Sequence, residues 1–184
     1  HCSSEKQAVY VLAQIRERLQ NCGLQLHPEK TKIVYCRDEN RRQPTSRPER
    51  FTFLGYEFKS RMCENSRNGT IFFNFTPAIS TKANQAITKV LRELKIHSWT
   101  NTTMDDIAKV LNAKIRGWIN YYGRFRKSEM QLVFRRLNER LCKWIRLKYK
   151  RLGISWRKAR IVLQAIYQQQ PKLFVHWQHG FKPC

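Results

Sequence analysis

The spacing of apolar residues divides the chain near residue 79. Before that point, apolar residues at steps of three and four predict one amphipathic helix, which starts in a capping box at residues 4–7 and stops at Gly23. β-branched residues predict a strand at residues 31–36, and a polar, basic loop is expected over residues 37–50. The chain therefore opens as a helix, a turn and a strand.

Two further strands are predicted to form a hairpin. Alternating apolar and polar residues indicate a strand over residues 51–58, in which Gly55 marks a bulge or a close backbone approach. An Asn-Gly turn at residues 68–69 leads into a second strand at residues 71–75, which Pro77 is expected to end.

Four amphipathic helices are predicted in the remainder, each with one apolar stripe. Their expected starts are Ser80, Thr103, Ser128 and Ser155. Gly153 is expected to close the third helix, and Pro171 follows the fourth. Because four apolar stripes need a common core, the predicted fold class is α+β, with a small helix–strand–hairpin part over residues 1–78 and an all-α helical bundle over residues 79–184.

Composition limits the class of protein. The 184 residues are 41% hydrophobic, with only 7 Gly and 6 Pro, which excludes a disordered basic tail. No run approaches the roughly 18 apolar residues of a membrane span, and the first residues lack the order of a signal peptide. A soluble, intracellular protein is expected, and because it begins with His1 we take the sequence as part of a longer protein.

Positive charge is concentrated in the second half of the chain. The formal net charge is +23, and residues 79–184 hold 23 of the 36 Lys and Arg but only 5 of the 13 acids. Residues 109–160 alone contain 17 Lys or Arg and two Glu. A solvated helix face normally carries about as many acids as bases, so this excess indicates a polyanionic partner, because each neutralised phosphate releases counterions.

One group of candidate RNA-binding residues lies on the third predicted helix of the bundle. Arg136, Arg140 and Lys143 recur there at steps of three and four. Like charges at this spacing destabilise the free protein, which is consistent with phosphates occupying that face.

A second group immediately precedes this helix. It comprises Arg116, Asn120, Tyr121, Arg124, Arg126 and Lys127. The basic side chains are expected to grip phosphates and Tyr121 to stack on an unpaired base, which is how irregular RNA is held. Asn120 is expected either to read a base edge or to cap a neighbouring segment, whereas Trp118 and Tyr122 continue the apolar stripe and are expected in the core.

The residues by themselves predict no active site. Phosphoryl transfer needs carboxylates that converge on divalent metal, and the chain has three Asp. Asp105 and Asp106 follow Thr103 at a predicted helix start, where carboxylates favour the positive end of the helix dipole. The 6 Cys include no Cys-x-x-Cys pair, and the His176-x-x-His179 pair has no further ligands nearby, so no zinc site is expected.

Three blocks of sequence carry a family resemblance. They are GLQLHPEKTK at residues 23–32, FTFLGYEF at residues 51–58 and IRGWINYY at residues 115–122. In this order they closely resemble blocks of group II intron-encoded reverse transcriptases, the intron maturases. The first two look like the C-terminal part of the polymerase palm, and the third is similar to the maturase-specific domain X, which serves as the thumb.

The resemblance implies roles for parts of this chain. Residues 1–78 would be the C-terminal part of the palm and residues 79–184 the thumb. The Tyr-x-Asp-Asp motif of the family is missing here, so the chain is expected to be inactive as a polymerase by itself and to hold no cofactor, whereas the complete enzyme would use Mg²⁺. Lys30 or Lys32 corresponds to a basic residue proposed as general acid for pyrophosphate departure. The residues that correspond to the primer grip are Phe53, Leu54, Gly55 and Tyr56.

The resemblance also implies partners and leaves two alternatives. Domain X binds intron RNA in splicing and template-primer in synthesis, so group II intron RNA and an RNA template with a DNA primer are the expected partners, in a bacterial cytoplasm or an organelle. The oligomeric state is left open. One alternative is a stand-alone basic RNA- or DNA-binding module, such as a degenerate splicing factor. The other, weaker alternative is a membrane-surface protein with basic amphipathic helices.

Overall fold

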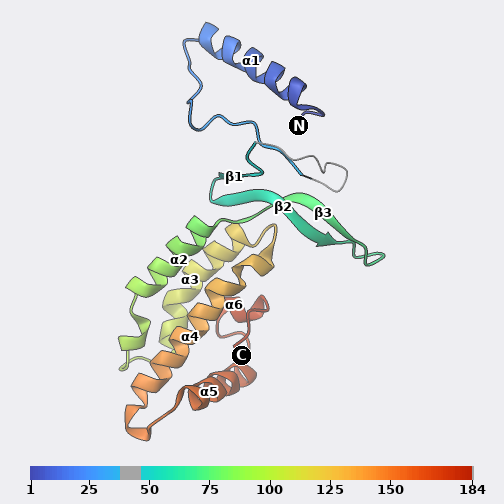
Figure 1. The fold of residues 1–184 in the computed structure, drawn as a ribbon. Coiled ribbons are helices and arrows are strands. Elements are labelled where there is room, and N and C mark those ends of the chain that lie inside the picture. Colours follow the sequence, from blue (N-terminus) through green and yellow to red (C-terminus); the bar gives the residue numbers. More distant parts are fainter. Residues whose placement is uncertain (38–46, 184) are drawn as a thin grey trace. The chain divides into compact units, whose positions relative to one another are not determined.

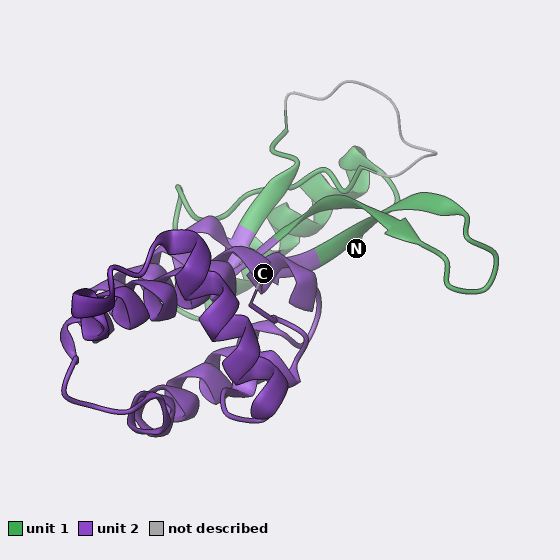
Figure 2. Ribbon diagram, turned by 90° about the horizontal axis from the view of Figure 1, so that it is seen from below, with its two compact units in different colours: residues 1–51, 58–76 green, residues 52–57, 77–184 purple. Residues whose placement is uncertain are grey.

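The computed structural model describes residues 1–37 and 47–183 of the chain. It contains two compact units, one formed by residues 1–51 and 58–76 and the other by residues 52–57 and 77–184 (Figure 2). Most of the predicted basic loop lies outside the described residues. The second unit therefore includes residues 52–57 of the first hairpin, which the predicted division at residue 78 assigns to the first part of the chain.

The first unit begins with helix α1, Glu5–Asn21 (Figure 1). Ser4 caps it as predicted, since its hydroxyl oxygen accepts a hydrogen bond from the Gln7 N–H at 3.2 Å. The Gln7 side chain accepts in turn from the Ser3 N–H at 2.8 Å, one residue before the position that an ordinary capping box uses. The predicted stop is also confirmed, because Gly23 follows the helix with a φ of 72°.

The strand predicted at residues 31–36 is wrong. These residues belong to no strand in the described part of the chain, although the Tyr35 N–H donates to the Pro48 carbonyl at 2.9 Å. β-branched residues favour an extended backbone, but a strand also requires a neighbour that pairs along its length.

The three-stranded sheet has the order β1-β2-β3, with β1 at Arg50–Phe53, β2 at Tyr56–Glu64 and β3 at Ile71–Ile79. The single strand predicted over residues 51–58 is wrong, because a tight turn at Leu54 and Gly55 divides it into β1 and β2. Both turn residues have positive φ, 47° and 80°, which is the requirement of a type I′ hairpin turn.

The second hairpin follows the prediction at its turn but not at its end. Gly69 has a φ of 68°, and the Asn68 side chain accepts from the Thr70 N–H at 3.1 Å. β3, however, continues through Pro77, which was expected to end it. Pro is tolerated because β3 lies at an edge of the sheet, where a missing N–H breaks no ladder bond on the open side.

The second unit is a helical bundle, which confirms the predicted α+β class. Its main helices are α2 (Thr81–Glu93), α3 (Met104–Tyr122), α4 (Gln131–Lys148) and α5 (Trp156–Gln169). Short α6 (Val175–Gln178) and the 3₁₀ helices Ile96–Ser98, Lys127–Met130 and Lys150–Leu152 connect or follow them. Figure 1 shows α2, α3 and α4 side by side, and no helix among the described residues is both long and apolar enough to cross a membrane.

Three of the four predicted helix starts are confirmed. Ser80, Thr103 and Ser155 each accept a hydrogen bond from a backbone N–H three residues later. The start predicted at Ser128 is wrong, since residues 127–130 form a 3₁₀ turn and α4 begins at Gln131 with no side-chain cap. The third predicted helix ends at Lys148, and Gly153, with a φ of 57°, closes the 3₁₀ turn that follows.

Helix α4 lies at the centre of the bundle. Phe134, Leu137, Leu141 and Ile145 on its apolar face have no exposed surface. Trp144 also donates its indole N–H to the Trp99 carbonyl at 2.7 Å, which fixes the α2–α3 connection against α4.

The C-terminal segment is held by two amide side chains, the half-buried Asn112 and the buried Asn138. The Asn112 side chain donates to the Leu173 carbonyl at 2.9 Å and accepts from the Val175 N–H at 3.0 Å. The Asn138 carbonyl oxygen lies 2.9 Å from His176 Nε2 and accepts from the Trp177 indole N–H at 3.0 Å. Because that oxygen only accepts, His176 carries its proton on Nε2, and its Nδ1 has no partner among the described residues.

Burial of His176 makes the stability of the helical unit depend on pH. Burial lowers the pKa of His176 from 6.5 to about 3. Below pH 6.5 the imidazole of His176 is therefore protonated in the unfolded chain but stays neutral in the folded chain. The free energy of unfolding falls as the pH falls through 6.5. Between pH 7.5 and pH 5 this group should remove about 2 kcal/mol of unfolding free energy.

Urea unfolding at both pH values measures this loss, with His176→Gln as the reference. The variant lacks the titrating ring, so its loss over the same range should be about 2 kcal/mol smaller than that of the unaltered chain. An identical pH dependence of the two proteins would contradict the buried, neutral histidine.

Candidate nucleic-acid interface

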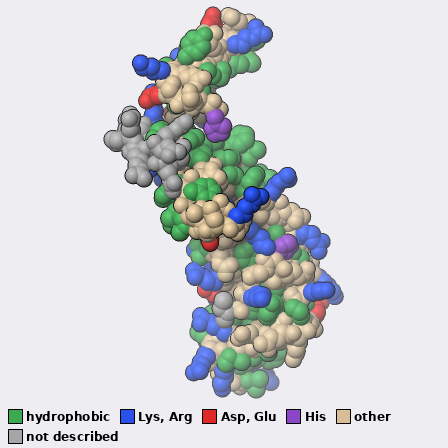
Figure 3. Space-filling model, turned by 90° about the vertical axis from the view of Figure 1, so that its right-hand side faces the viewer, with side chains coloured by type: hydrophobic (Ala, Val, Ile, Leu, Met, Phe, Trp, Pro, Cys, Tyr) green, Lys and Arg blue, Asp and Glu red, His purple; other side chains and the backbone are tan. Residues whose placement is uncertain are grey.

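Lys and Arg side chains are spread over the helical unit, with few acids among them (Figure 3). The amphipathic helices produce this distribution, because each buries its apolar stripe in the common core and turns its charged residues to the surface. The question for function is where these cations converge.

One pocket of about 400 Å³ concentrates them. It is lined by residues of three helices: Thr88 and Arg92 of α2, Arg136, Glu139, Arg140 and Lys143 of α4, and Trp156 at the start of α5. We call this the basic pocket. It brings together all three predicted RNA-binding residues of α4, whose spacing of three and four places them on one helix face.

Among the described residues, Glu139 is the one acid that lines the basic pocket, against four cations. None of these cations forms an ion pair in the part of the chain that the structure describes. Burial lowers the pKa of Arg140, the neighbouring Arg92 and Arg136 lower it further, and the charge of Glu139 raises it. Like charges held together at a partly desolvated site favour an anionic ligand.

Positive charges of the basic pocket also act on His97, which lies on the 3₁₀ helix before α3. Burial lowers the pKa of His97, and so do the positive charges of Lys143, Arg140 and Lys95. The field of the cations therefore extends beyond the residues that line the basic pocket.

Two contacts order side chains within the basic pocket. Arg136 donates from Nη1 to the Thr88 hydroxyl at 3.2 Å, which joins α4 to α2. The Arg146 guanidinium lies over the Trp156 ring, 4.5 Å from its centroid, and its Nε donates to the Ile154 carbonyl at 3.2 Å.

The second predicted group is not part of the basic pocket. Among these described residues, Arg116 and Asn120 are exposed on α3, Arg124 and Lys127 are exposed after it, and Arg126 is half-buried. Their roles in phosphate and base recognition stay predictions.

Tyr121 has a structural contact in addition to its predicted role. Its hydroxyl donates to the Leu54 carbonyl at 2.9 Å, while its ring packs against Tyr56 at 5.4 Å between centroids. Tyr121 is 47% exposed, and its stacking on a base stays a prediction. Trp118 and Tyr122 pack against the core, as expected.

The predicted primer-grip residues form the hairpin tip that belongs to the helical unit. Tyr56 is buried and donates its hydroxyl hydrogen bond to the Tyr121 carbonyl, and burial raises the pKa of Tyr56. The Gly55 carbonyl accepts from the Ser80 N–H at 2.9 Å. Phe53 and Leu54 are 60% and 67% exposed, so the tip combines a buried anchor with two exposed apolar side chains.

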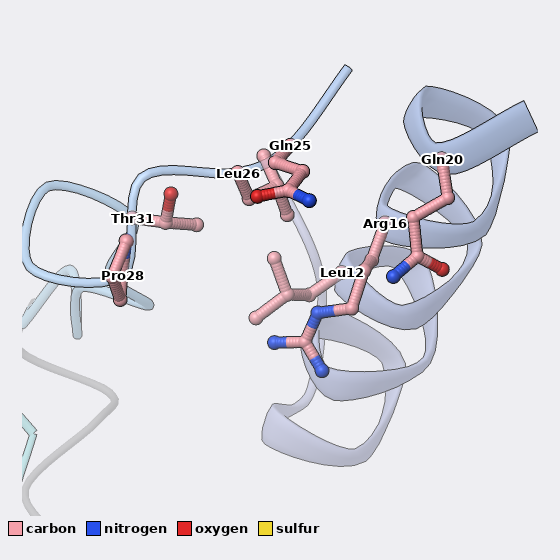
Figure 4. Close-up of a pocket in the computed structure, with 7 residues that line it drawn as sticks. All are labelled: Leu12, Arg16, Gln20, Gln25, Leu26, Pro28 and Thr31. Carbon is pink, nitrogen blue, oxygen red and sulfur yellow. The ribbon is translucent and has the colours of Figure 1, made fainter. Parts of the chain in front are cut away.

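Lys30 and Lys32 are exposed in the first unit. Near them, a pocket of about 350 Å³ lies between α1 and the segment that follows it (Figure 4). Its lining is Leu12, Arg16, Gln20, Gln25, Leu26, Pro28 and Thr31. This lining contains one charged group and no carboxylate, so it offers no metal ligands, and the predicted general-acid role of either lysine stays untested.

The other acids and histidines that the structure describes form no metal-binding cluster. Asp106 completes a capping box with Thr103, and the hydrogen bond from the Thr103 hydroxyl is the main cause that lowers the pKa of Asp106. This agrees with the predicted helix start. Among the described residues, no three His, Cys, Asp or Glu side chains gather in a way that could hold a metal ion.

Sequence reasoning missed four residues of the basic pocket: Thr88, Arg92, Glu139 and Trp156. Arg92 and Trp156 belong to other helices, 44 positions before Arg136 and 13 positions after Lys143, and no local spacing connects them to the predicted residues of α4. The sequence offered no signal for Trp156, because its spacing of three from Ala159 and seven from Leu163 places it in phase with the apolar stripe of α5.

Comparison with known proteins supports a relationship to intron maturases. Residues 84–162 match the family described as "Group II intron, maturase-specific domain". The match covers less than half of the chain, runs from α2 into α5 and includes every residue that lines the basic pocket. No curated protein matches the chain significantly.

The hairpin tip generates a stability prediction. A Cβ at Gly55 would lie 2.9 Å from the Tyr122 hydroxyl oxygen, at a φ of +80° that L side chains rarely adopt. Gly55→Ala should therefore combine backbone strain with a clash and cost about 2–3 kcal/mol of unfolding free energy. Urea unfolding followed by circular dichroism measures this loss.

Two controls separate strain from clash. Gly69→Ala has a similar φ of +68° and nothing within 4 Å, so it should cost only about 1–2 kcal/mol. In a Tyr122→Phe background, the cost of Gly55→Ala should fall, because the nearest atom is removed. A cost that is the same in both backgrounds would contradict the contact between the hairpin tip and α3.

Proposed function

We propose that this chain is an RNA-binding, C-terminal fragment of a group II intron reverse transcriptase or maturase. The observation that carries the proposal is the match of residues 84–162 to the maturase-specific domain, which supports a maturase-related role in splicing. In the complete protein, the fragment would act in intron splicing and in RNA-directed DNA synthesis.

The surface of the helical unit supports RNA as the ligand. The match region contains the basic pocket, whose four cations come from two helices and have no ion-pair partners among the described residues. Phosphates would relieve the repulsion between these cations and release their own counterions. Group II intron RNA and an RNA template with a DNA primer are the proposed partners.

The proposal assigns no chemical step to this chain. Mg²⁺ would serve the complete enzyme as the ion that holds the attacking and leaving oxygens in line. The acids described here do not fit such a site, since Asp106 is engaged in a helix cap and no metal-binding group of side chains gathers among the described residues. The contribution of this chain would be to hold RNA and the primer end.

RNA affinity should fall steeply with salt. Binding of group II intron RNA should give a log–log slope that corresponds to roughly 6–10 displaced counterions. Arg136→Gln, Arg140→Gln or Lys143→Gln should each flatten the slope by about one unit. Fluorescence anisotropy across a salt series measures the slope.

The matched control is Lys89→Gln on α2. Lys89 Nζ lies 3.9 Å from Glu93 Oε1, and Lys89 does not line the basic pocket. The salt slope of this variant should therefore equal that of the unaltered chain. A slope near one or two for the unaltered chain would mean that the cations do not face the RNA.

The purified chain should not extend a primer. With Mg²⁺, all four deoxynucleotides and an RNA template with a DNA primer, we expect no incorporation above background, because the described acids form no metal site. A gel-based extension assay checks this, with a complete reverse transcriptase as the positive control. Incorporation by this chain would overturn the proposed inactivity.

A further inference from the structure

The basic pocket combines features that a flat cationic surface lacks. It is concave, with a volume of about 400 Å³, and an aromatic ring stands beside its arginines. This volume lies within the range of about 300–1,000 Å³ that is typical of small-molecule sites. The space therefore suits one small, anionic and partly aromatic group.

The arginines are arranged for an anion. Arg136 is oriented by its hydrogen bond to Thr88, at 3.2 Å, and Arg92 reaches the same space from α2. Arg140 is half-buried between them, so its charge is less screened by water than that of an exposed side chain. Guanidinium groups match phosphate oxygens in geometry as well as charge.

Trp156 supplies a stacking surface at the edge of the same pocket. Trp156 is 44% exposed, and the Arg146 guanidinium lies over its ring at 4.5 Å from the centroid. Arg146 is itself held by the Ile154 carbonyl, so the ring is backed by a positioned cation. A base could stack on the opposite ring face, and stacking of this kind accepts any base.

We propose that the basic pocket binds a single unstacked nucleotide of an RNA strand, with its phosphate between Arg92, Arg136 and Arg140 and its base on Trp156. The inference rests on the proposed function, because it takes RNA as the ligand, and it adds which feature of the RNA is recognised. A base within a continuous duplex is stacked on both faces and cannot enter. Bulges and single-stranded junctions are therefore the preferred elements.

The test compares two RNA hairpins that differ by one bulged adenosine. Fluorescence anisotropy with the whole chain should show tighter binding of the bulged hairpin. Trp156→Leu should weaken its binding by about 5- to 100-fold while changing the fully paired hairpin by less than about 2-fold. Trp156→Phe keeps an aromatic ring and should retain most of the preference.

Matched controls come from the same unit. Tyr149→Leu removes another exposed aromatic side chain, which does not line the basic pocket, and should leave the preference unchanged. Arg140→Gln should reduce the preference for the bulge, whereas Arg135→Gln, on the same helix but outside the pocket, should affect both hairpins equally. Circular dichroism and thermal unfolding confirm that each variant is folded.

A competition assay identifies the chemistry of the occupant. Adenosine monophosphate should displace the bulged hairpin at lower concentration than inorganic phosphate does, because only the nucleotide reaches Trp156. Equal competition by the two would leave an anion site without base recognition and overturn the proposal. Equal affinity of the unaltered chain for both hairpins would overturn the nucleotide pocket but not RNA binding, whereas failure to bind either RNA would overturn both.

Discussion

Burial of the apolar face of α4 is the constraint on which the helical unit depends. Phe134, Leu137, Leu141 and Ile145 are completely covered, and each such side chain contributes about 1.5–3 kcal/mol. This stabilisation exceeds the repulsion between partly screened cations on the outer face of the helix. α4 can therefore hold Arg136, Arg140 and Lys143 close together with only Glu139 among them, and an anionic ligand would relieve the repulsion that remains between these cations.

Polar side chains then hold the C-terminal segment in one arrangement, which the apolar core alone does not specify. Asn138 stands on the buried side of α4 and holds the C-terminal segment through His176 and Trp177. Asn112 does the same from α3. A buried amide without partners is costly, so each of these residues favours a single arrangement of the segment over other apolar packings.

The hairpin tip extends the helical unit with residues from an earlier part of the chain. A turn with two positive φ values turns the chain back, and Tyr56 then packs among the aromatic side chains at the end of α3. Tyr56, one of the predicted primer-grip residues, and Tyr121 are consequently parts of one aromatic cluster. A functional contact at either place would affect the other through the Tyr121–Leu54 hydrogen bond.

The sequence by itself determined the features that depend on neighbouring residues. The caps at Ser4, Ser80, Thr103 and Ser155 each require only a backbone N–H three residues away, and the apolar stripes follow from the helical period. The excess of positive charge in the second half is likewise a property of composition. These local signals predicted the helices, the fold class and the basic face of α4.

Only the tertiary structure decided which of those elements pair or pack with one another. Residues 31–36 have the composition of a strand but belong to no strand in the described part of the chain, and the turn at Leu54 and Gly55 divides what alternation alone indicates as one strand. The basic pocket requires α2, α4 and α5 to pack so that Arg92 and Trp156 reach the arginines of α4. Periodicity identifies the buried face of each helix, but it does not specify which helix lies beside which, because that choice depends on contacts between residues far apart in the chain.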